Sequence, residues 1–92
     1  MSRTIRQSIS ALLEEQELSA RDLALTLALT VREVEEHLAH LERSLGQRLV
    51  IHPAVCRNCG YEFRSRRRLD APGRCPRCRQ QRLDGPWFRV GS

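Results

Sequence analysis

The sequence has no lysine and few aromatic residues. All 16 of its basic residues are arginines, and phenylalanine, tryptophan and tyrosine make up 4% of its 92 residues. No stretch approaches the roughly 18 consecutive apolar residues of a membrane-spanning helix, and none resembles a secretory signal. We therefore expect a soluble, cytoplasmic chain. A chain this short buries only about 60 to 65% of its unfolded surface, which suits one small domain or two mini-domains that share a core.

The charges are divided between the two halves of the chain. Residues 1–45 hold five arginines against eight acidic residues, a net charge of −3, whereas residues 46–92 hold eleven arginines against three acidic residues, a net charge of +8. Arginine suits phosphate because its planar guanidinium donates two parallel hydrogen bonds. The division favours a polyanionic partner for the second half. The simpler alternatives are a solvated surface and a compositional bias of the genome.

The chain contains four cysteines, arranged as two Cys-x-x-Cys pairs with fifteen residues between them. Two such pairs at this separation are typical of a tetrahedral zinc site, in which each pair forms a turn that directs two thiolates at one ion. We expect one structural zinc ion. Two disulfides are the alternative in an oxidising compartment, and iron is the second metal to consider, because residues 56–61 also resemble a rubredoxin knuckle. The expected ligands are Cys56, Cys59, Cys75 and Cys78.

Enzymatic activity is not expected from this sequence. Four cysteine ligands leave zinc no open position for the water that a catalytic zinc site needs. The sequence also lacks a nucleophilic triad, a phosphate-binding loop and a pair of catalytic carboxylates. His37 and His40, with Glu33 and Glu36, have a spacing that would allow a second metal, but we interpret them as a solvated helix face.

Three amphipathic helices are predicted in the first half of the chain. Apolar residues recur at helical spacing within residues 5–13, 23–27 and 31–45. A capping box, in which the side chains of the first and fourth residues each bond the other's backbone, precedes each stretch. Gly46 stands where a glycine would end the third helix. The capping boxes begin at Thr4, Ser19 and Thr30.

The second and third predicted helices, joined by a short turn near Leu29, resemble the helix-turn-helix of winged repressors. A generic helical bundle or an oligomerisation unit is the alternative. In a helix-turn-helix the third helix enters the major groove, so its first residues, Thr30, Arg32 and Glu33, are the candidates for base contact. Glu36 lies on the same face as Glu33, and both carboxylates repel phosphate. The expectation of DNA binding therefore rests more on the second half of the chain.

The second half predicts short strands around the cysteines. Residues 48–51 form a strand that Pro53 confines to a sheet edge or ends, residues 61–69 form a ribbon strand, and residues 70–73 form a turn. A last strand spans residues 87–90, where Trp87 and Phe88 are expected to pack rather than to stack on bases.

We therefore predict an α+β chain. Residues 1–46 form a three-helix, winged helix-turn-helix domain, and residues 47–92 form a small β-hairpin zinc ribbon that replaces or extends the wing.

These features together resemble a family of prokaryotic predicted transcriptional regulators, in which an N-terminal helix-turn-helix is fused to a C-terminal zinc ribbon. The resemblance covers nearly the whole chain and implies zinc and a regulatory role, without naming an operator or an effector. It is carried by the helix from Thr30 to Leu41, by Pro53-Ala-x-Cys-x-x-Cys-Gly-Tyr-x-Phe63, by Pro72-x-x-Cys-Pro-x-Cys78 and by Pro86-x-Phe-x-Val90.

Three functions follow from these observations. The first is a zinc-stabilised DNA-binding regulator, expected to be a homodimer because two half-sites supply the specificity that one small module lacks. The second is an adaptor whose acidic helical half binds a basic partner while the ribbon binds another protein or RNA. The third is a rubredoxin-like electron carrier. For the regulator, the expected phosphate contacts on the ribbon are Arg64, Arg66, Arg67 and Arg68.

Overall fold

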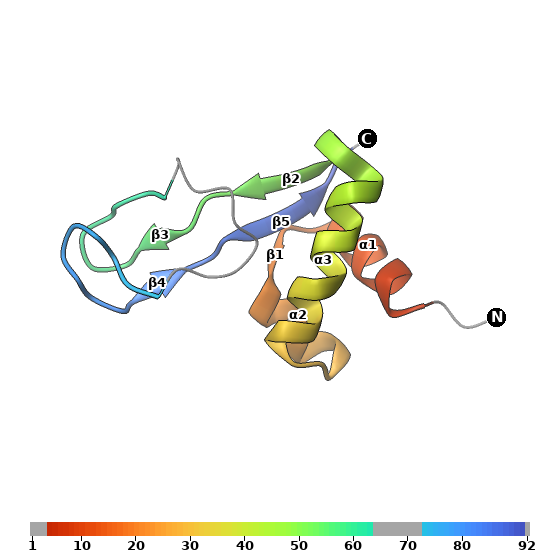
Figure 1. Cartoon of the computed structure of the whole chain (residues 1–92), viewed down its shortest axis with the longest axis horizontal. Helices are drawn as coiled ribbons and strands as arrows, with labels where there is room; N and C mark the ends of the chain where they lie inside the picture. Colours follow the sequence, from red (N-terminus) through yellow and green to blue (C-terminus); the bar gives the residue numbers. More distant parts are fainter. Residues whose placement is uncertain (1–3, 64–72, 92) are drawn as a thin grey trace.

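The computed structural model describes residues 4–63 and 73–91, which form a mixed α+β structure with three helices and two small antiparallel sheets. Figure 1 shows the helices gathered at one end of the molecule and strands β3 and β4 at the other. No helix in these two ranges has both the length and the apolar composition to cross a bilayer. The elements are α1 (Ile5–Glu15), β1 (Leu18–Ser19), α2 (Ala20–Leu27), α3 (Val31–Leu45), the 3-10 turn η1 (Gly46–Arg48), β2 (Leu49–His52), β3 (Val55–Cys56), β4 (Leu83–Asp84) and β5 (Trp87–Val90).

The three helices begin where the capping boxes predict. In each case the N-cap side chain accepts a hydrogen bond from the backbone N–H three residues later, and the side chain of that residue accepts one from the N-cap N–H. These bonds satisfy backbone donors that have no partner within the helix. Helix α3 ends at Gly46, whose φ of +57° is one that glycine adopts without steric cost.

The larger sheet has the strand order β1-β5-β2, and all of its pairings are antiparallel. Strand β5 is the last in the chain but the central one in the sheet, with Phe88 opposite Leu18 on one side and opposite Ile51 on the other. Strand β2 lies at an edge, as Pro53 predicts.

Strand β1 was not predicted from the sequence. It contains two residues, Leu18 and Ser19, too few to show an alternating pattern, and it is a strand only because β5 pairs with it. Ser19 is also the N-cap of α2, so its sequence signal is that of a helix start.

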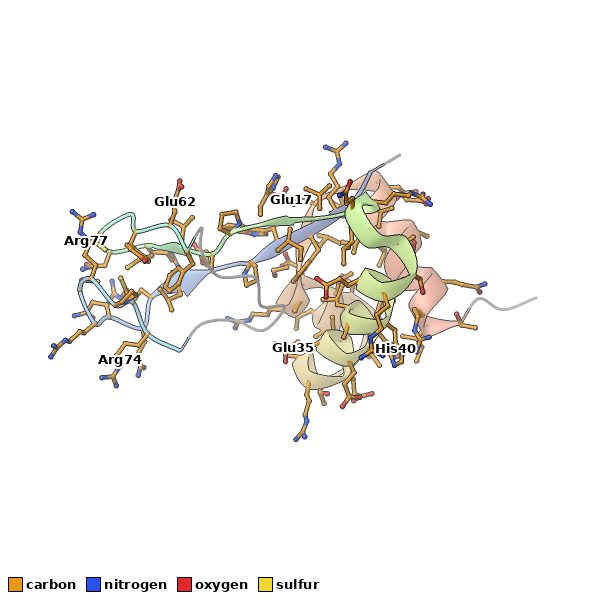
Figure 2. The ribbon with its side chains drawn as sticks, turned by 45° about the horizontal axis from the view of Figure 1, so that its top comes forward. Glu17, Glu35, His40, Glu62, Arg74 and Arg77 are labelled. Atoms are coloured by element: carbon orange, nitrogen blue, oxygen red, sulfur yellow. The ribbon has the colours of Figure 1, made fainter. Side chains whose placement is uncertain are left out.

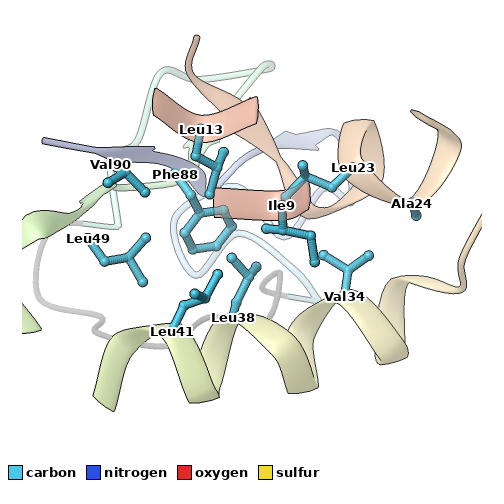
Figure 3. Packing of buried hydrophobic residues seen from close by; sticks show 10 residues of the cluster. All are labelled: Ile9, Leu13, Leu23, Ala24, Val34, Leu38, Leu41, Leu49, Phe88 and Val90. Atoms are coloured by element: carbon cyan, nitrogen blue, oxygen red, sulfur yellow. The ribbon is translucent and has the colours of Figure 1, made fainter. Parts of the chain in front are cut away.

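Phe88 lies at the centre of the hydrophobic core and has no exposed surface. Figure 3 shows its ring between Leu38 and Leu41 of α3 on one side and Leu13 of α1 on the other. The last strand therefore completes the core of the helices, although it lies beyond the domain boundary predicted at residue 46. The core consists of Ile9, Leu13, Leu23, Ala24, Val34, Leu38, Leu41, Leu49, Phe88 and Val90.

The residues between β2 and β5 carry the four cysteines and form the second, smaller sheet, in which Val55 pairs with Asp84 and Cys56 with Leu83. On its other side β3 is bridged to Glu62. Most of the strand predicted over residues 61–69, and most of the turn predicted over residues 70–73, lie outside the described residues. The ribbon is thus an insertion into the β2–β5 hairpin.

Replacing Phe88 by alanine tests the central position of this side chain. The substitution is expected to lower the free energy of unfolding by about 3 to 5 kcal/mol, because it leaves a cavity between α1, α3 and the sheet. Denaturant unfolding of the zinc-loaded protein, followed by far-ultraviolet circular dichroism, measures the loss. Val50→Ala on the neighbouring strand is the control, because Val50 is 38% exposed and should cost less than about 1 kcal/mol. Equal losses would contradict the role of Phe88.

Candidate metal centre

The four cysteine sulfurs converge on one point. All four lie within 4.8 Å of one another, with 3.5 Å between the Sγ atoms of Cys56 and Cys78 and 3.7 Å between those of Cys59 and Cys75. A disulfide needs about 2.05 Å, so none is formed. Four sulfurs bound to zinc at about 2.3 Å stand about 3.8 Å apart at the corners of a tetrahedron. The sulfurs therefore have the spacing of one structural zinc site.

The two Cys-x-x-Cys turns have nearly the same backbone structure. In each, the N–H of the residue after the second cysteine donates to the carbonyl of the first cysteine, at 2.9 Å from Gly60 and 2.8 Å from Arg79. The N–H of the first cysteine donates in turn to the carbonyl of the residue five positions later. These bonds close both turns around the sulfurs without help from distant residues.

The residue that follows each pair has a positive φ, +78° at Gly60 and +62° at Arg79. Glycine adopts this conformation at Gly60 without steric cost. The positive φ of Arg79 could not be predicted, because an arginine gives no sequence signal for this conformation. The conformation costs an L-residue about 1 to 2 kcal/mol. The repeated hydrogen-bond pattern shows that the second turn needs the same backbone shape as the first.

Hydrogen-bond donors in the turns favour the thiolate form of two cysteines. The backbone N–H of Gln80 and the side chain of Asn58 lower the pKa of Cys78 to about 6. Burial raises the pKa of Cys75, but the backbone N–H groups of Cys78 and Arg77 outweigh it, and the pKa is lowered. Because zinc binds thiolates rather than thiols, these donors prepare the site for the metal.

Cys59 behaves differently from the other ligands. The backbone N–H of Tyr61 lowers its pKa, but partial desolvation and the three neighbouring thiols raise the pKa to about 11. Four thiolates this close repel one another, so one of them holds its proton until a cation balances the charge. Zinc supplies that charge when it binds.

The other predicted site residues lie elsewhere. Thr30, Arg32 and Glu33 are exposed at the start of α3, where the capping box already engages two of them: the Thr30 hydroxyl donates to Glu33 Oε1 at 3.0 Å and accepts from the Glu33 N–H at 3.1 Å. The four ribbon arginines predicted to contact phosphate, Arg64, Arg66, Arg67 and Arg68, lie outside the described residues.

Two further residues clarify which side chains serve the metal. Asn58 was not singled out from the sequence, since an asparagine within a Cys-x-x-Cys pair gives no sign that its side chain bonds a sulfur. His52, which precedes the first pair, contacts the carboxylate of Glu17 and is not part of the cysteine cluster.

Removal of the metal should unfold the ribbon and leave the helices in place. A structural zinc contributes an apparent 10 to 16 kcal/mol or so, whereas the hydrophobic core contains no metal ligand. Chelation is expected to collapse the amide chemical-shift dispersion of residues 54–63 and 73–85, while most of the helical circular dichroism is retained. Elemental analysis before chelation should find one zinc per chain. Unchanged ribbon amides after removal would contradict the structural role of the metal.

Substitutions of the residue that follows each Cys-x-x-Cys pair should change the free energy of unfolding in opposite directions. Gly60→Ala is expected to cost about 1 to 2 kcal/mol from its positive φ alone, since an added Cβ would meet nothing within 4 Å. Arg79→Gly is expected to gain about 0.5 to 1 kcal/mol, because relief of the strain exceeds the added flexibility of the unfolded chain. Denaturant unfolding of the zinc-loaded protein measures both. Arg79→Ala controls for the lost charge and should not stabilise.

Comparison with known proteins matches both parts of the chain. Residues 4–49 match the family model described as PF0610-like, N-terminal, and residues 53–92 match the model of the PF0610 rubredoxin-like zinc beta-ribbon domain. The solution NMR structure of protein PF0610 from Pyrococcus furiosus is 29% identical and superposes with a TM-score of 0.75, covering 100% of this chain and 92% of that one. No curated protein matches. The chain belongs to the PF0610-like family, in which a helical N-terminal domain is joined to a rubredoxin-like zinc ribbon.

Proposed function

We propose that this protein is a zinc-stabilised, DNA-binding transcriptional regulator with a winged helix-turn-helix fold. The observation that carries the proposal is the order of the elements: α1, β1, α2, α3 and then the β2–β5 hairpin, in a sheet of order β1-β5-β2. This is the order of a winged helix, in which α2 and α3 form the helix-turn-helix and the hairpin is the wing. The zinc ribbon, inserted between β2 and β5, would then extend the wing.

The charge of the second half of the chain supports a nucleic-acid partner. Zinc and four thiolates together carry −2, so residues 46–92 keep a net charge of +6 when the metal is bound. Figure 2 shows Arg74 and Arg77 pointing away from the end of the ribbon farthest from the helices. A surface of this kind contacts phosphates, which position a protein on the duplex without reading its sequence.

The residues at the start of α3 would contact the bases and so recognise the DNA sequence, as in other helix-turn-helix proteins. Arg32 is exposed there between two residues of the capping box, and arginine pairs with guanine through two hydrogen bonds. Glu33 and Glu36 are exposed on the same helix. Their carboxylates accept hydrogen bonds from cytosine but repel phosphate, so α3 would bind only where the ribbon holds the backbone.

A second candidate function, a protein-interaction adaptor, is favoured by the acidity of α3. This helix holds four glutamates against two arginines. Leu25 of the adjoining α2 is 76% exposed. A basic partner protein would fit such a surface, with the ribbon left to bind a second protein or RNA.

Titration of the zinc-loaded protein with a random duplex pool, with selection for enriched sequences at several salt concentrations, separates the two functions. A regulator should enrich a palindrome, because a dimer binds two half-sites. If about four phosphates are neutralised, the logarithm of affinity should fall with the logarithm of salt concentration at a slope near −3.6. Weak binding without enrichment would discard the regulator and favour the adaptor.

Replacing Arg66, Arg67 and Arg68 together by alanine should weaken binding and flatten the slope to about −0.9, since three phosphate contacts are lost. Replacing Arg6 and Arg43 of the helical half is the control and should leave the slope unchanged. An unchanged affinity of the ribbon variant would discard the ribbon as the phosphate contact.

A further inference from the structure

A polar cleft lies where the ribbon meets α2. Its volume is about 470 Å³, within the range of about 300 to 1,000 Å³ that small-molecule sites occupy. Three arginines from separate segments line it: Arg21 from the first turn of α2, Arg57 from the first Cys-x-x-Cys pair and Arg82 from the approach to β4. Asn58 and Gln81 also line it.

The pairing of the two ribbon strands brings two of these arginines opposite each other. Val55 pairs with Asp84 and Cys56 with Leu83, so the next position sets Arg57 opposite Arg82. The backbone N–H of Arg57 donates to the Arg82 carbonyl at 2.7 Å, as this register requires. Like charges directly opposite each other destabilise a strand pair unless an opposite charge lies near them.

The acidic residue within the cleft compensates only part of this charge. Asp84 is the one acid among the lining residues, and its Oδ2 lies 3.4 Å from Arg57 Nε. The side chains of Arg57 and Asp84 are 67% and 49% exposed, and an ion pair this exposed is weak. Three arginines against one aspartate leave the lining with a net charge of +2.

We propose that this cleft binds a phosphate group, with Arg21, Arg57 and Arg82 as its charged donors and the amide of Gln81 as a neutral one. Guanidinium groups suit phosphate because they donate in pairs. The phosphate belongs either to a free phosphorylated small molecule or to a nucleic-acid backbone. The phosphate site is inferred from the residues of the cleft alone and does not depend on sequence-specific DNA binding by the protein. Because Arg21 belongs to the helices and the others to the ribbon, a bound phosphate holds the two parts together.

Titration of the full-length, zinc-loaded protein with pyrophosphate tests the site. Amide and arginine Nε–H chemical shifts should move at Arg57, Asn58 and Arg82. Arg57→Ala and Arg82→Ala should each weaken binding about tenfold, the loss of one charged hydrogen-bond donor. Arg89→Ala is the control, since Arg89 is an exposed strand arginine outside the cleft. The affinity of this variant for pyrophosphate should equal that of the unchanged protein. Shifts and losses shared equally by all exposed arginines would overturn the site.

A substitution that should strengthen phosphate binding distinguishes a specific site from a general loss of structure, which could only weaken binding. Asp84→Asn keeps the shape of the side chain, removes the one negative charge in the cleft and releases Arg57. It should tighten pyrophosphate binding by about threefold or more, since an exposed ion pair contributes up to about 1 kcal/mol. Glu62→Gln is the matched control, because it removes a ribbon carboxylate that does not line this cleft. Unchanged or weaker binding by Asp84→Asn would contradict the proposal.

A parallel titration with duplex DNA of random sequence distinguishes the two sources of phosphate. If Arg57→Ala and Arg82→Ala weaken DNA binding and Arg89→Ala does not, while pyrophosphate fails to bind, the ligand is the nucleic-acid backbone. If pyrophosphate binds and the same variants leave DNA affinity unchanged, the ligand is a small molecule. If neither ligand distinguishes the cleft variants from the control, no phosphate site exists here.

Discussion

The pairing of β5 between β1 and β2 is the constraint on which the rest of the structure depends. It places Phe88 in the centre of the helical core and returns the chain from the ribbon to the helices. The ribbon is therefore held at both ends by one three-stranded sheet. An insertion anchored in this way needs little hydrophobic core of its own, provided that another interaction stabilises its fold.

Zinc stabilises the fold of the ribbon. Few described ribbon residues are buried, and its aromatic pair, Tyr61 and Phe63, packs edge to face with 5.0 Å between ring centroids. A core this small cannot offset the conformational entropy of ordering the described ribbon residues, at about 1 to 2 kcal/mol each for the backbone. Four thiolates on one metal supply the missing free energy. The two turns, matched in hydrogen bonding and in φ, hold the sulfurs at the spacing that one metal ion needs.

The division of charge follows the same architecture. The acidic residues are concentrated in the helices, and the arginines lie mainly on the insertion, which projects from the helices along the long axis of a molecule 48 Å in extent. A polyanion bound to this basic surface would lie away from the glutamates of α3 and would be repelled less by them. Where the two parts meet, Arg21 adds a third arginine to the two that the ribbon strands bring together.

By itself the sequence determined the local features of this protein: three capped helices, a strand before Pro53, a last strand near Phe88 and a four-cysteine zinc site. Each follows from residues close together in the chain, through helical spacing, capping or Cys-x-x-Cys turns. Only the tertiary structure decided that β5 is central, that Leu18 and Ser19 form a strand, and that Arg57 lies opposite Arg82. These depend on pairing between distant segments, where strand register, rather than local residue preference, sets which side chains meet.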